Sequence, residues 1–153
     1  MGMKAKRTWQ EKLCGAKGLP KVGRIGGKMS TRWGTGTMVI PNPLEVDELM
    51  TRVPKGRLVT ITELRAALAK KHKVNIACPI TTGIFAWIAA HAAEETRGKN
   101  PYWRTLKTGG QLNEKYPGGI PALRRKLQAE GHKVVQKGKK HLVADYERVL
   151  AAL

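Results

Sequence analysis

Cysteine is scarce in this sequence, and long apolar runs are missing. Two cysteines in 153 residues, Cys14 and Cys78, provide neither a disulfide framework nor a cluster of metal ligands. No apolar run approaches the roughly 20 residues that a membrane-spanning helix needs. The basic residues 1–7 are not followed by the apolar stretch of a secretion signal. We therefore expect a cytoplasmic protein that contacts no membrane and holds no metal or cofactor.

Acidic residues are also few, and the resulting positive charge is the strongest signal in the sequence. Eleven Asp and Glu stand against 29 Lys and Arg, a formal net charge of +18. Residues 1–28 carry +7 and residues 97–140 carry +10, whereas residues 29–96 carry +2 and residues 141–153 carry −1. A surface with this charge attracts polyanions, which favours DNA or RNA as the partner. The alternatives are a soluble protein of high pI without such a partner, and one that binds an acidic protein.

Residues 1–40 form a basic, glycine-rich arm with little hydrophobic periodicity. The spacing of Trp9 and Leu13 predicts one short helix that ends at the next glycine. We expect no further regular element in the arm, because each ordered glycine loses much conformational entropy. Trp9, Trp33 and Val39 indicate that parts of the arm pack on the rest of the chain. We expect that rest, residues 41–153, to form one domain.

Residues 42–96 contain the signals of three capped helices. Asn42 followed by proline starts the first, a capping box from Thr60 to Glu63 starts the second, and Pro79 starts the third. Two capped helices joined by a short turn are typical of a helix-turn-helix. The predicted buried stripes are Val46, Leu49, Met50 and Val53 in the first helix, Leu64, Ala67 and Leu68 in the second, and Phe85, Ile88, Ala89 and Ala92 in the third.

The second half of the chain begins with a loop and ends with a hairpin and a helix. Residues 98–119 are rich in glycine and proline, and a loop of this length in a compact domain is usually functional or disordered. A fourth helix starts at Pro121 and ends at Gly131. Residues 134–143 predict a hairpin with a basic tip, and Asp145 is expected to cap a last helix. The predicted fold class is therefore mainly α, a winged helix-turn-helix domain with a small β-hairpin and a basic N-terminal arm.

Several short motifs stand in the order and spacing found in one protein family. They are Val53-Pro54-Lys55-Gly56-Arg57, Thr60-Ile61-Thr62-Glu63-Leu64, Gly110-Gln111-Leu112, Tyr116-Pro117-Gly118-Gly119, Lys126-Leu127 and Glu130-Gly131. With them, residues 44–131 resemble the DNA-binding, active-site domain of the O6-alkylguanine-DNA alkyltransferases and the alkyltransferase-like proteins. The resemblance covers a little over half of the chain. It implies a winged helix-turn-helix fold, double-stranded DNA as the partner, and a recognition helix that enters the minor groove.

The reactive motif of that family is altered in this chain. The family has Pro-Cys-His-Arg where this sequence has Pro101-Tyr102-Trp103-Arg104. Alkyl transfer requires a thiolate, which a histidine base generates and a carboxylate steadies, and Glu130 matches that carboxylate. A phenol is a poor nucleophile at neutral pH and an indole is no base. We therefore expect no catalytic residues. Alkyltransferase-like proteins also lack the cysteine and are thought to flag alkylated DNA without repairing it, although they typically carry tryptophan at that position.

Two groups with which the family extrudes a base are also missing. Ile61 stands where the family has a tyrosine, and Gly83 or Thr82 stands where it has an arginine that fills the vacated stack. These groups offset the energetic cost of base flipping, so damage recognition is a weaker inference than DNA binding. Trp87 on the same helix has two interpretations, a wedge between bases or a core residue.

The candidate site residues fall into two sets. By resemblance, the pocket comprises Tyr102, Trp103, Arg104, Tyr116, Gly118, Gly119 and Glu130. The predicted nucleic-acid contacts are Thr60, Ile61, Thr82, Gly83, Trp87, Arg97, Lys99, Lys107, Lys115, Arg124, Arg125, Lys137, Lys139 and Lys140. Cys78 is predicted to be a small buried residue rather than a reactive thiol.

These observations predict a monomeric, non-enzymatic DNA-binding protein, with recognition of O6-alkylguanine as the finer hypothesis. Nucleotide excision repair proteins are candidate further partners, and a bacterial or archaeal source would imply association with the nucleoid. Two alternatives stay open. One is a general DNA-, RNA- or ribonucleoprotein-binding protein on the same fold. The other is an enzyme that uses a different site, such as Cys14 or Cys78 as an alkyl acceptor.

Overall fold

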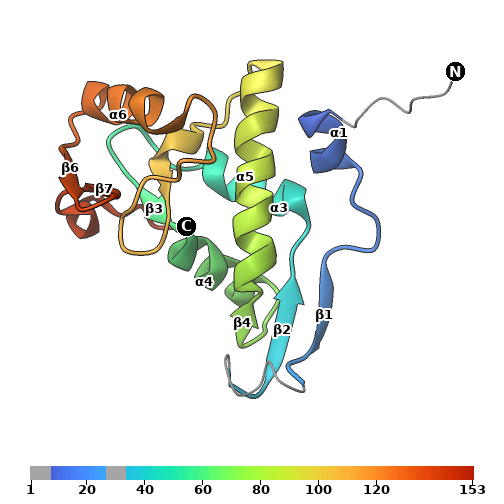
Figure 1. The fold of residues 1–153 in the computed structure, drawn as a ribbon. Helices are drawn as coiled ribbons and strands as arrows, with labels where there is room; N and C mark the ends of the chain where they lie inside the picture. Colours follow the sequence, from blue (N-terminus) through green and yellow to red (C-terminus); the bar gives the residue numbers. More distant parts are fainter. Residues whose placement is uncertain (1–7, 27–33) are drawn as a thin grey trace, which may run out of the picture.

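The computed structural model describes residues 8–26 and 34–153, and its central element is the helix α5 (Pro79–Thr96). Figure 1 shows α5 upright in the middle, with α1 (Trp9–Cys14) on one side and α6 (Gly119–Ala129) on the other. Helix α4 (Ile61–Lys71) lies beside the first turns of α5. Elements from both ends of the chain are thus arranged around one long helix.

The arm contains the predicted short helix. In α1 the hydroxyl of Thr8 accepts a hydrogen bond from the backbone N–H of Glu11, and Gly15 caps the other end. Leu13 is buried in the core, and α1 packs against α5. The prediction that parts of the arm pack on the rest of the chain is confirmed for α1. Trp33 lies outside the described residues.

The prediction that the remainder of the arm is irregular is wrong. Strand β1 (Lys21–Arg24) pairs antiparallel with β2 (Thr37–Ile40), and β2 pairs parallel with β4 (Ile76–Ala77). Val39 in β2 is fully buried. The glycine-rich segment becomes ordered because β2 gains partners on both of its edges, one of them far away in the sequence. The division of the chain at residue 40 stays a prediction.

Local capping signals correctly predicted the helices α3 (Pro43–Thr51) and α4. Asn42 caps α3, and its capping box with Glu45 is complete. Thr60 caps α4, and the carboxylate of Glu63 accepts a hydrogen bond from the backbone N–H of Thr60 at 2.7 Å. The predicted stripes are largely buried: Val46, Leu49, Met50 and Val53 in and after α3, and Leu64 and Leu68 in α4.

The buried stripe predicted for α5 is confirmed at Ala89 and Ala92 and wrong at its two large side chains. Phe85 and Ile88 are only partly buried, whereas the small side chains of the helix are buried: Thr82, Ala86, Ala89, Ala90, Ala92 and Ala93. Small residues allow close approach of α1 and α3, which both pack on α5. The helix is apolar on nearly every side, so periodicity does not identify its buried face.

The second half of the chain contains short elements and one regular helix. After η1 (Tyr102–Arg104), β5 (Thr105–Leu106) pairs parallel with β3 (Val59–Thr60). Helix α6 confirms the fourth predicted helix. The predicted hairpin is also present, with β6 (Val134–Lys137) antiparallel to β7 (Lys140–Val143). Whether it acts as a wing stays a prediction.

The prediction of a last α-helix after Asp145 is wrong. Residues 146–149 form only the short 3-10 helix η2 (Tyr146–Val149). Asp145 precedes it with a positive φ of 56°, and its side chain makes no capping hydrogen bond. The chain then becomes extended, because its backbone pairs with that of Leu58 in a parallel bridge. The N–H of Leu58 donates to the carbonyl of Val149 at 2.9 Å, and the N–H of Ala151 donates to the carbonyl of Leu58 at 2.8 Å.

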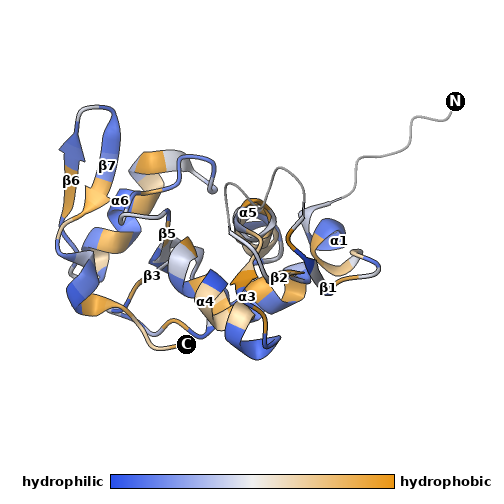
Figure 2. Ribbon diagram, turned by 90° about the horizontal axis from the view of Figure 1, so that it is seen from below, coloured by the Kyte–Doolittle hydropathy of each residue, from blue (hydrophilic) through white to orange (hydrophobic). Residues whose placement is uncertain are grey.

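The fold is mixed α/β rather than mainly α, which corrects the predicted class. Within the described residues, three small sheets join the helices: β1-β2-β4, β3-β5 and β6-β7. Figure 2 shows hydrophobic residues on α3, α4 and one end of the hairpin, and hydrophilic residues at its tip. In the part of the chain that the structure describes, no helix combines the length and apolarity that a bilayer crossing requires.

Candidate nucleic-acid interface

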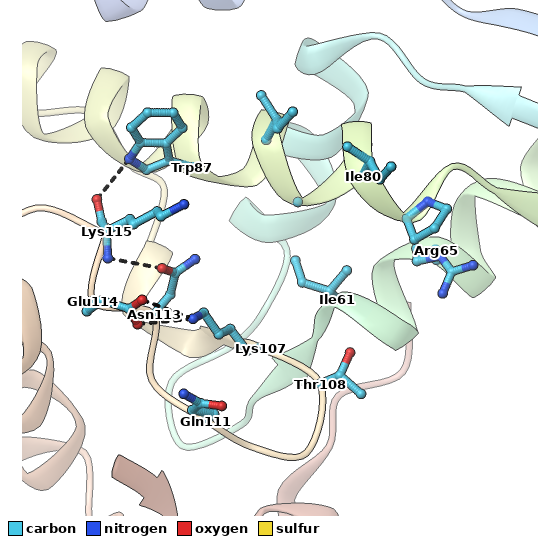
Figure 3. A pocket seen from close by; sticks show the side chains of 13 residues that line it. Ile61, Arg65, Ile80, Trp87, Lys107, Thr108, Gln111, Asn113, Glu114 and Lys115 are labelled. Atoms are coloured by element: carbon cyan, nitrogen blue, oxygen red, sulfur yellow. Dashed lines mark hydrogen bonds and ion pairs between the residues drawn. The ribbon is translucent and has the colours of Figure 1, made fainter. Parts of the chain in front are cut away.

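A groove of about 590 Å³ lies between α4, the first half of α5 and the loop of residues 107–115 (Figure 3). It brings together five of the predicted nucleic-acid contacts, which come from three separate segments: Ile61, Gly83, Trp87, Lys107 and Lys115. It also includes residues that the sequence did not point to, namely Arg65, Pro79, Ile80, Ile84, Thr108, Gln111, Asn113 and Glu114. The two helices of the predicted helix-turn-helix thus form one wall of this groove.

Aliphatic side chains of α5 form one wall of this groove. Ile80 is 56% exposed and Ile84 is 43% exposed, and they lie one helical turn apart on the same face. Thr82 points the opposite way, is fully buried, and donates its hydroxyl to the carbonyl of Cys78 at 2.6 Å. A Cβ added at Gly83 would meet nothing within 4 Å, so this position is open.

Cationic side chains line the same groove. Arg65 is held in place because its Nε donates to the carbonyl of Ala77 at 3.0 Å. Lys107 pairs with Glu114 at 3.0 Å, whereas Lys115 projects from an exposed position on the loop. A backbone hydrogen bond and Lys107 hold the pKa of Glu114 below its ordinary value, so this carboxylate is charged at neutral pH. Three cations against one anion leave the groove positive.

Two side chains of α5 hold the loop in its place. The carbonyl of Lys115 accepts a hydrogen bond from Nε1 of Trp87 at 2.8 Å and lies 2.7 Å from Nε2 of His91. A carbonyl can only accept, so Nε2 of His91 carries a proton. Trp9 of α1 stacks on His91 with ring centroids 4.4 Å apart, and its edge contacts Trp87. Trp87 is therefore neither a free wedge nor a fully buried core residue, because it packs against Trp9 and the loop while it also lines the groove.

The motif at residues 101–104, which resembles the reactive motif of the alkyltransferases, lies outside this groove. Tyr102 is 3% exposed and donates its hydroxyl to the carboxylate of Glu94 at 3.0 Å. Burial, and then the negative charge of Glu94, raise the pKa of Tyr102. A neutral, hydrogen-bonded phenol is no nucleophile at neutral pH. Its ring is not among the groups that line the groove.

Trp103 and Arg104 of this motif both bind the carboxylate of Glu130. Nε1 of Trp103 donates at 3.1 Å and Nε of Arg104 donates at 2.9 Å, and Nη2 of Arg104 completes a two-pronged ion pair. Nη1 of Arg104 donates to the carbonyl of Val53 at 2.8 Å. Burial opposes the charge of Glu130, but the hydrogen bonds from Arg104 and Trp103 keep its pKa below the ordinary value. The indole replaces a histidine as a hydrogen-bond donor, yet it cannot accept a proton from a nucleophile.

The remaining pocket residues have structural roles. Tyr116 is 3% exposed, and its ring meets Tyr102 edge to face at 6.0 Å. Gly118 has a φ of +78°, and a Cβ there would lie 2.5 Å from the Cβ of Ala122. Gly119 begins α6 with a φ of +65°. Backbone geometry and close packing therefore explain both glycines without a phosphate.

The other predicted contacts are dispersed. Thr60 is 3% exposed and acts as the cap of α4. Arg97 and Lys99 lie at the end of α5 and line a smaller cavity with Tyr102 and Trp103. Arg124 and Arg125 lie on α6 and border another hollow. Exposed positions on the hairpin are occupied by Lys137, Lys139 and Lys140.

The structure also shows how the two cysteines are placed. Cys78 is 6% exposed, as predicted, and Cys14 is exposed on α1. Among residues 8–26 and 34–153, no group of three or more His, Cys, Asp or Glu side chains is placed to hold a metal ion.

Comparison with known proteins identifies the fold. No family model and no curated protein sequence matches this chain. Two solved structures are similar: S. pombe Atl1 in complex with damaged DNA containing O6-carboxymethylguanine, and S. pombe ATL in complex with DNA. Each has a TM-score of 0.54 and 16% sequence identity, and the match covers 72% of this chain and 94% of the other. The chain therefore shares the fold of an alkyltransferase-like protein, as its motifs predicted.

Proposed function

We propose that this protein binds double-stranded DNA through the groove between α4, α5 and residues 107–115, and that it transfers no alkyl group. The observation that carries the proposal is the groove itself. It gathers five residues that were predicted to contact nucleic acid, and it does so on the fold with which S. pombe Atl1 binds damaged DNA.

The charge distribution supports DNA as the partner. The chain carries +18, and the groove is lined by Arg65, Lys107 and Lys115. Lysine and arginine side chains neutralise phosphates and release the counterions condensed on the duplex. The exposed lysines of the hairpin extend the basic surface beyond the groove.

The buried motif supports a role without catalysis. Its tyrosine hydroxyl is engaged by Glu94 and its tryptophan supplies no base, so the chemistry of alkyl transfer has no acceptor there. The finer part of the proposal is a preference for damaged duplex. Its support is the likeness to a structure that holds an O6-carboxymethylguanine lesion.

Fluorescence anisotropy with a labelled duplex tests DNA binding. The logarithm of the affinity should fall with the logarithm of the salt concentration by about 0.9 per neutralised phosphate. Lys115→Gln should reduce that slope by about 0.9 if Lys115 contacts a phosphate. Lys55→Gln is the matched control, since Lys55 is exposed and does not line the groove. A slope near zero, or tighter binding to RNA of the same sequence, would contradict the proposal.

Matched duplexes with and without O6-methylguanine test the finer part. At fixed salt the damaged duplex should bind more tightly. An affinity ratio of one would leave a general DNA-binding protein.

A further inference from the structure

We infer that Ile80 and Ile84 form an aliphatic wedge that enters a base step of the bound duplex, so that the protein selects DNA by weakened base stacking rather than by the alkyl group. This inference rests on the proposed function and specifies what the same groove recognises.

The first observation is the exposure of these two side chains. Helix α5 is apolar on nearly every side, and α1, α3 and α4 cover much of it. Its first two turns are nevertheless uncovered at Ile80 and Ile84, which are 56% and 43% exposed. Two neighbouring isoleucines that are exposed inside a groove rimmed by charged side chains favour a surface that a partner covers.

The second observation is that the wedge is rigid. Isoleucine is branched at Cβ, and in a helix one χ1 rotamer is strongly preferred. Pro79 fixes the first turn, and the hydrogen bond from Thr82 to the carbonyl of Cys78 closes it. Little side-chain entropy is therefore lost when the wedge enters a ligand.

The surroundings of the wedge identify its occupant as a duplex. Arg65, Lys107 and Lys115 line the same groove, so the partner must be anionic outside and apolar inside. A DNA base step has this character, because phosphates flank stacked bases. Proteins that kink DNA insert isoleucine, leucine or phenylalanine between bases from the minor groove.

The groove is poorly suited to hold an extruded base. The tyrosine that could stack on it, Tyr102, is buried away from the groove. The loop that would have to move is held by Trp87 and His91, both at the carbonyl of Lys115. Ile61 offers no ring on which a base could stack. Selection then follows the ease of opening a step, which is greatest at flexible pyrimidine–purine steps and at mismatched or damaged bases.

The experiment uses the full chain and duplexes that carry 2-aminopurine beside a central T·G mismatch, an O6-methylguanine or a matched pair. Binding should raise 2-aminopurine fluorescence in the mismatched and alkylated duplexes. It should also favour both over the matched duplex by about tenfold, because less stacking must be broken. The two imperfect duplexes should bind alike when their melting temperatures are alike.

The variant Ile80→Ala/Ile84→Ala should lose most of the fluorescence increase and most of that tenfold preference. Its salt slope on matched duplex should equal that of the wild type, because Arg65, Lys107 and Lys115 still contact phosphates. Alanine is a strong helix former, so α5 is retained. Ile84→Leu should keep the distortion, because it keeps an aliphatic side chain. Val22→Ala is the control, since Val22 is 52% exposed on β1 and lies outside the groove.

Three outcomes would overturn the wedge while DNA binding stands. In the first, the double variant raises 2-aminopurine fluorescence as much as the wild type does. In the second, the wild type causes no increase in fluorescence. In the third, the wild type prefers an O6-methylguanine duplex over a mismatched duplex of equal stability. Absence of salt-dependent binding by the wild-type chain would overturn the proposed function itself.

Discussion

The motif at residues 101–104 and the groove beside α5 differ in what they leave available to a ligand. In the motif, Tyr102, Trp103 and Arg104 all direct their polar groups to protein partners. In the groove, Ile80 and Ile84 are exposed and Lys115 projects into solvent. The motif is thus closed in the sense that its polar groups are engaged within the protein, whereas the groove leaves aliphatic and cationic side chains exposed.

This difference indicates that the motif holds the fold together, whereas the groove is available to a partner. The hydrogen bonds of Trp103 and Arg104 tie η1 to Glu130 at the end of α6 and to Val53 after α3, so they stabilise the arrangement of the elements. We expect substitutions in the motif to change folding stability and substitutions in the groove to change binding. The following predictions test that separation, beginning with the largest effect.

Removal of the Tyr102 ring should cause the largest loss of stability. Tyr102→Ala leaves a cavity in the core, which costs about 3–5 kcal/mol for an aromatic side chain. Tyr102→Phe keeps the ring and loses only the hydrogen bond to Glu94, so it should cost about 1 kcal/mol. Urea denaturation measures both. The ratio of affinities for damaged and undamaged duplex should not change in Tyr102→Phe, and a clear fall of that ratio would return the tyrosine to the binding site.

Breaking the ion pair of the motif should come next. Arg104 and Glu130 are 13% and 7% exposed at their side chains. Glu130→Ala leaves the guanidinium partly buried without its partner, which should cost roughly 3 kcal/mol. Glu114→Ala is the matched control, because Glu114 and Lys107 form an exposed pair whose loss should cost under about 1 kcal/mol. Equal losses of unfolding free energy in the two variants would contradict the closed character of the motif.

The sequence predicted those elements whose signals are local. The capping boxes at Asn42 and Thr60 lie within one turn of the helices that they start, so α3 and α4 were predicted correctly. Strand β2 was missed because its partner β4 is distant in the chain. The buried stripe of α5 was predicted correctly at Ala89 and Ala92 but not at Phe85 and Ile88, because a helix that is apolar on nearly every side has no periodic signal.

The candidate site was predictable to a similar degree. The family resemblance pointed to Ile61 and the positive charge of residues 97–140 pointed to Lys107, and their convergence was found only in the structure. It also pointed to a pocket at Tyr102, although a sequence does not show that a ring is buried. The hydrogen bond that joins Trp87 to Lys115 spans 28 residues, and no pattern along the chain predicts such a contact.

A smaller effect should appear in acid. The pKa of Glu130 is lower in the folded protein than its ordinary value, because Arg104 and Trp103 donate to its charged form. The stability that it contributes is complete above the unfolded pKa, about 4.3, and is lost as pH falls through the folded pKa. Burial lowers the pKa of His132, so protonation of this histidine adds a loss of the same sign, which begins near its ordinary pKa of about 6.5.

Urea denaturation at a series of pH values should separate these two groups. Glu130→Gln should flatten the decline of unfolding free energy below about pH 4.3. His132→Gln should flatten it at the higher pH and leave the lower part in place. If Glu130→Gln follows the wild-type curve throughout, the charged state of Glu130 contributes nothing to the stability of the motif.

The smallest expected effect is no change at all, in the mass of the protein after incubation with O6-methylguanine duplex. Tyr102 is buried and hydrogen-bonded, so the wild type has no acceptor at this position. Tyr102→Cys alone should also stay unmodified, because Trp103 supplies no base. Tyr102→Cys with Trp103→His places a thiol and a base near Glu130. The groove still does not reach residue 102, so we expect no alkylation.

Thiol titration of the unfolded variants confirms that each new cysteine is intact. A stoichiometric mass increase in the double variant would show that an alkylated base can reach the motif and would break the contrast between closed motif and open groove. An increase in the wild type, located at Cys14 or Cys78 by peptide mapping, would instead establish an enzyme with a different acceptor.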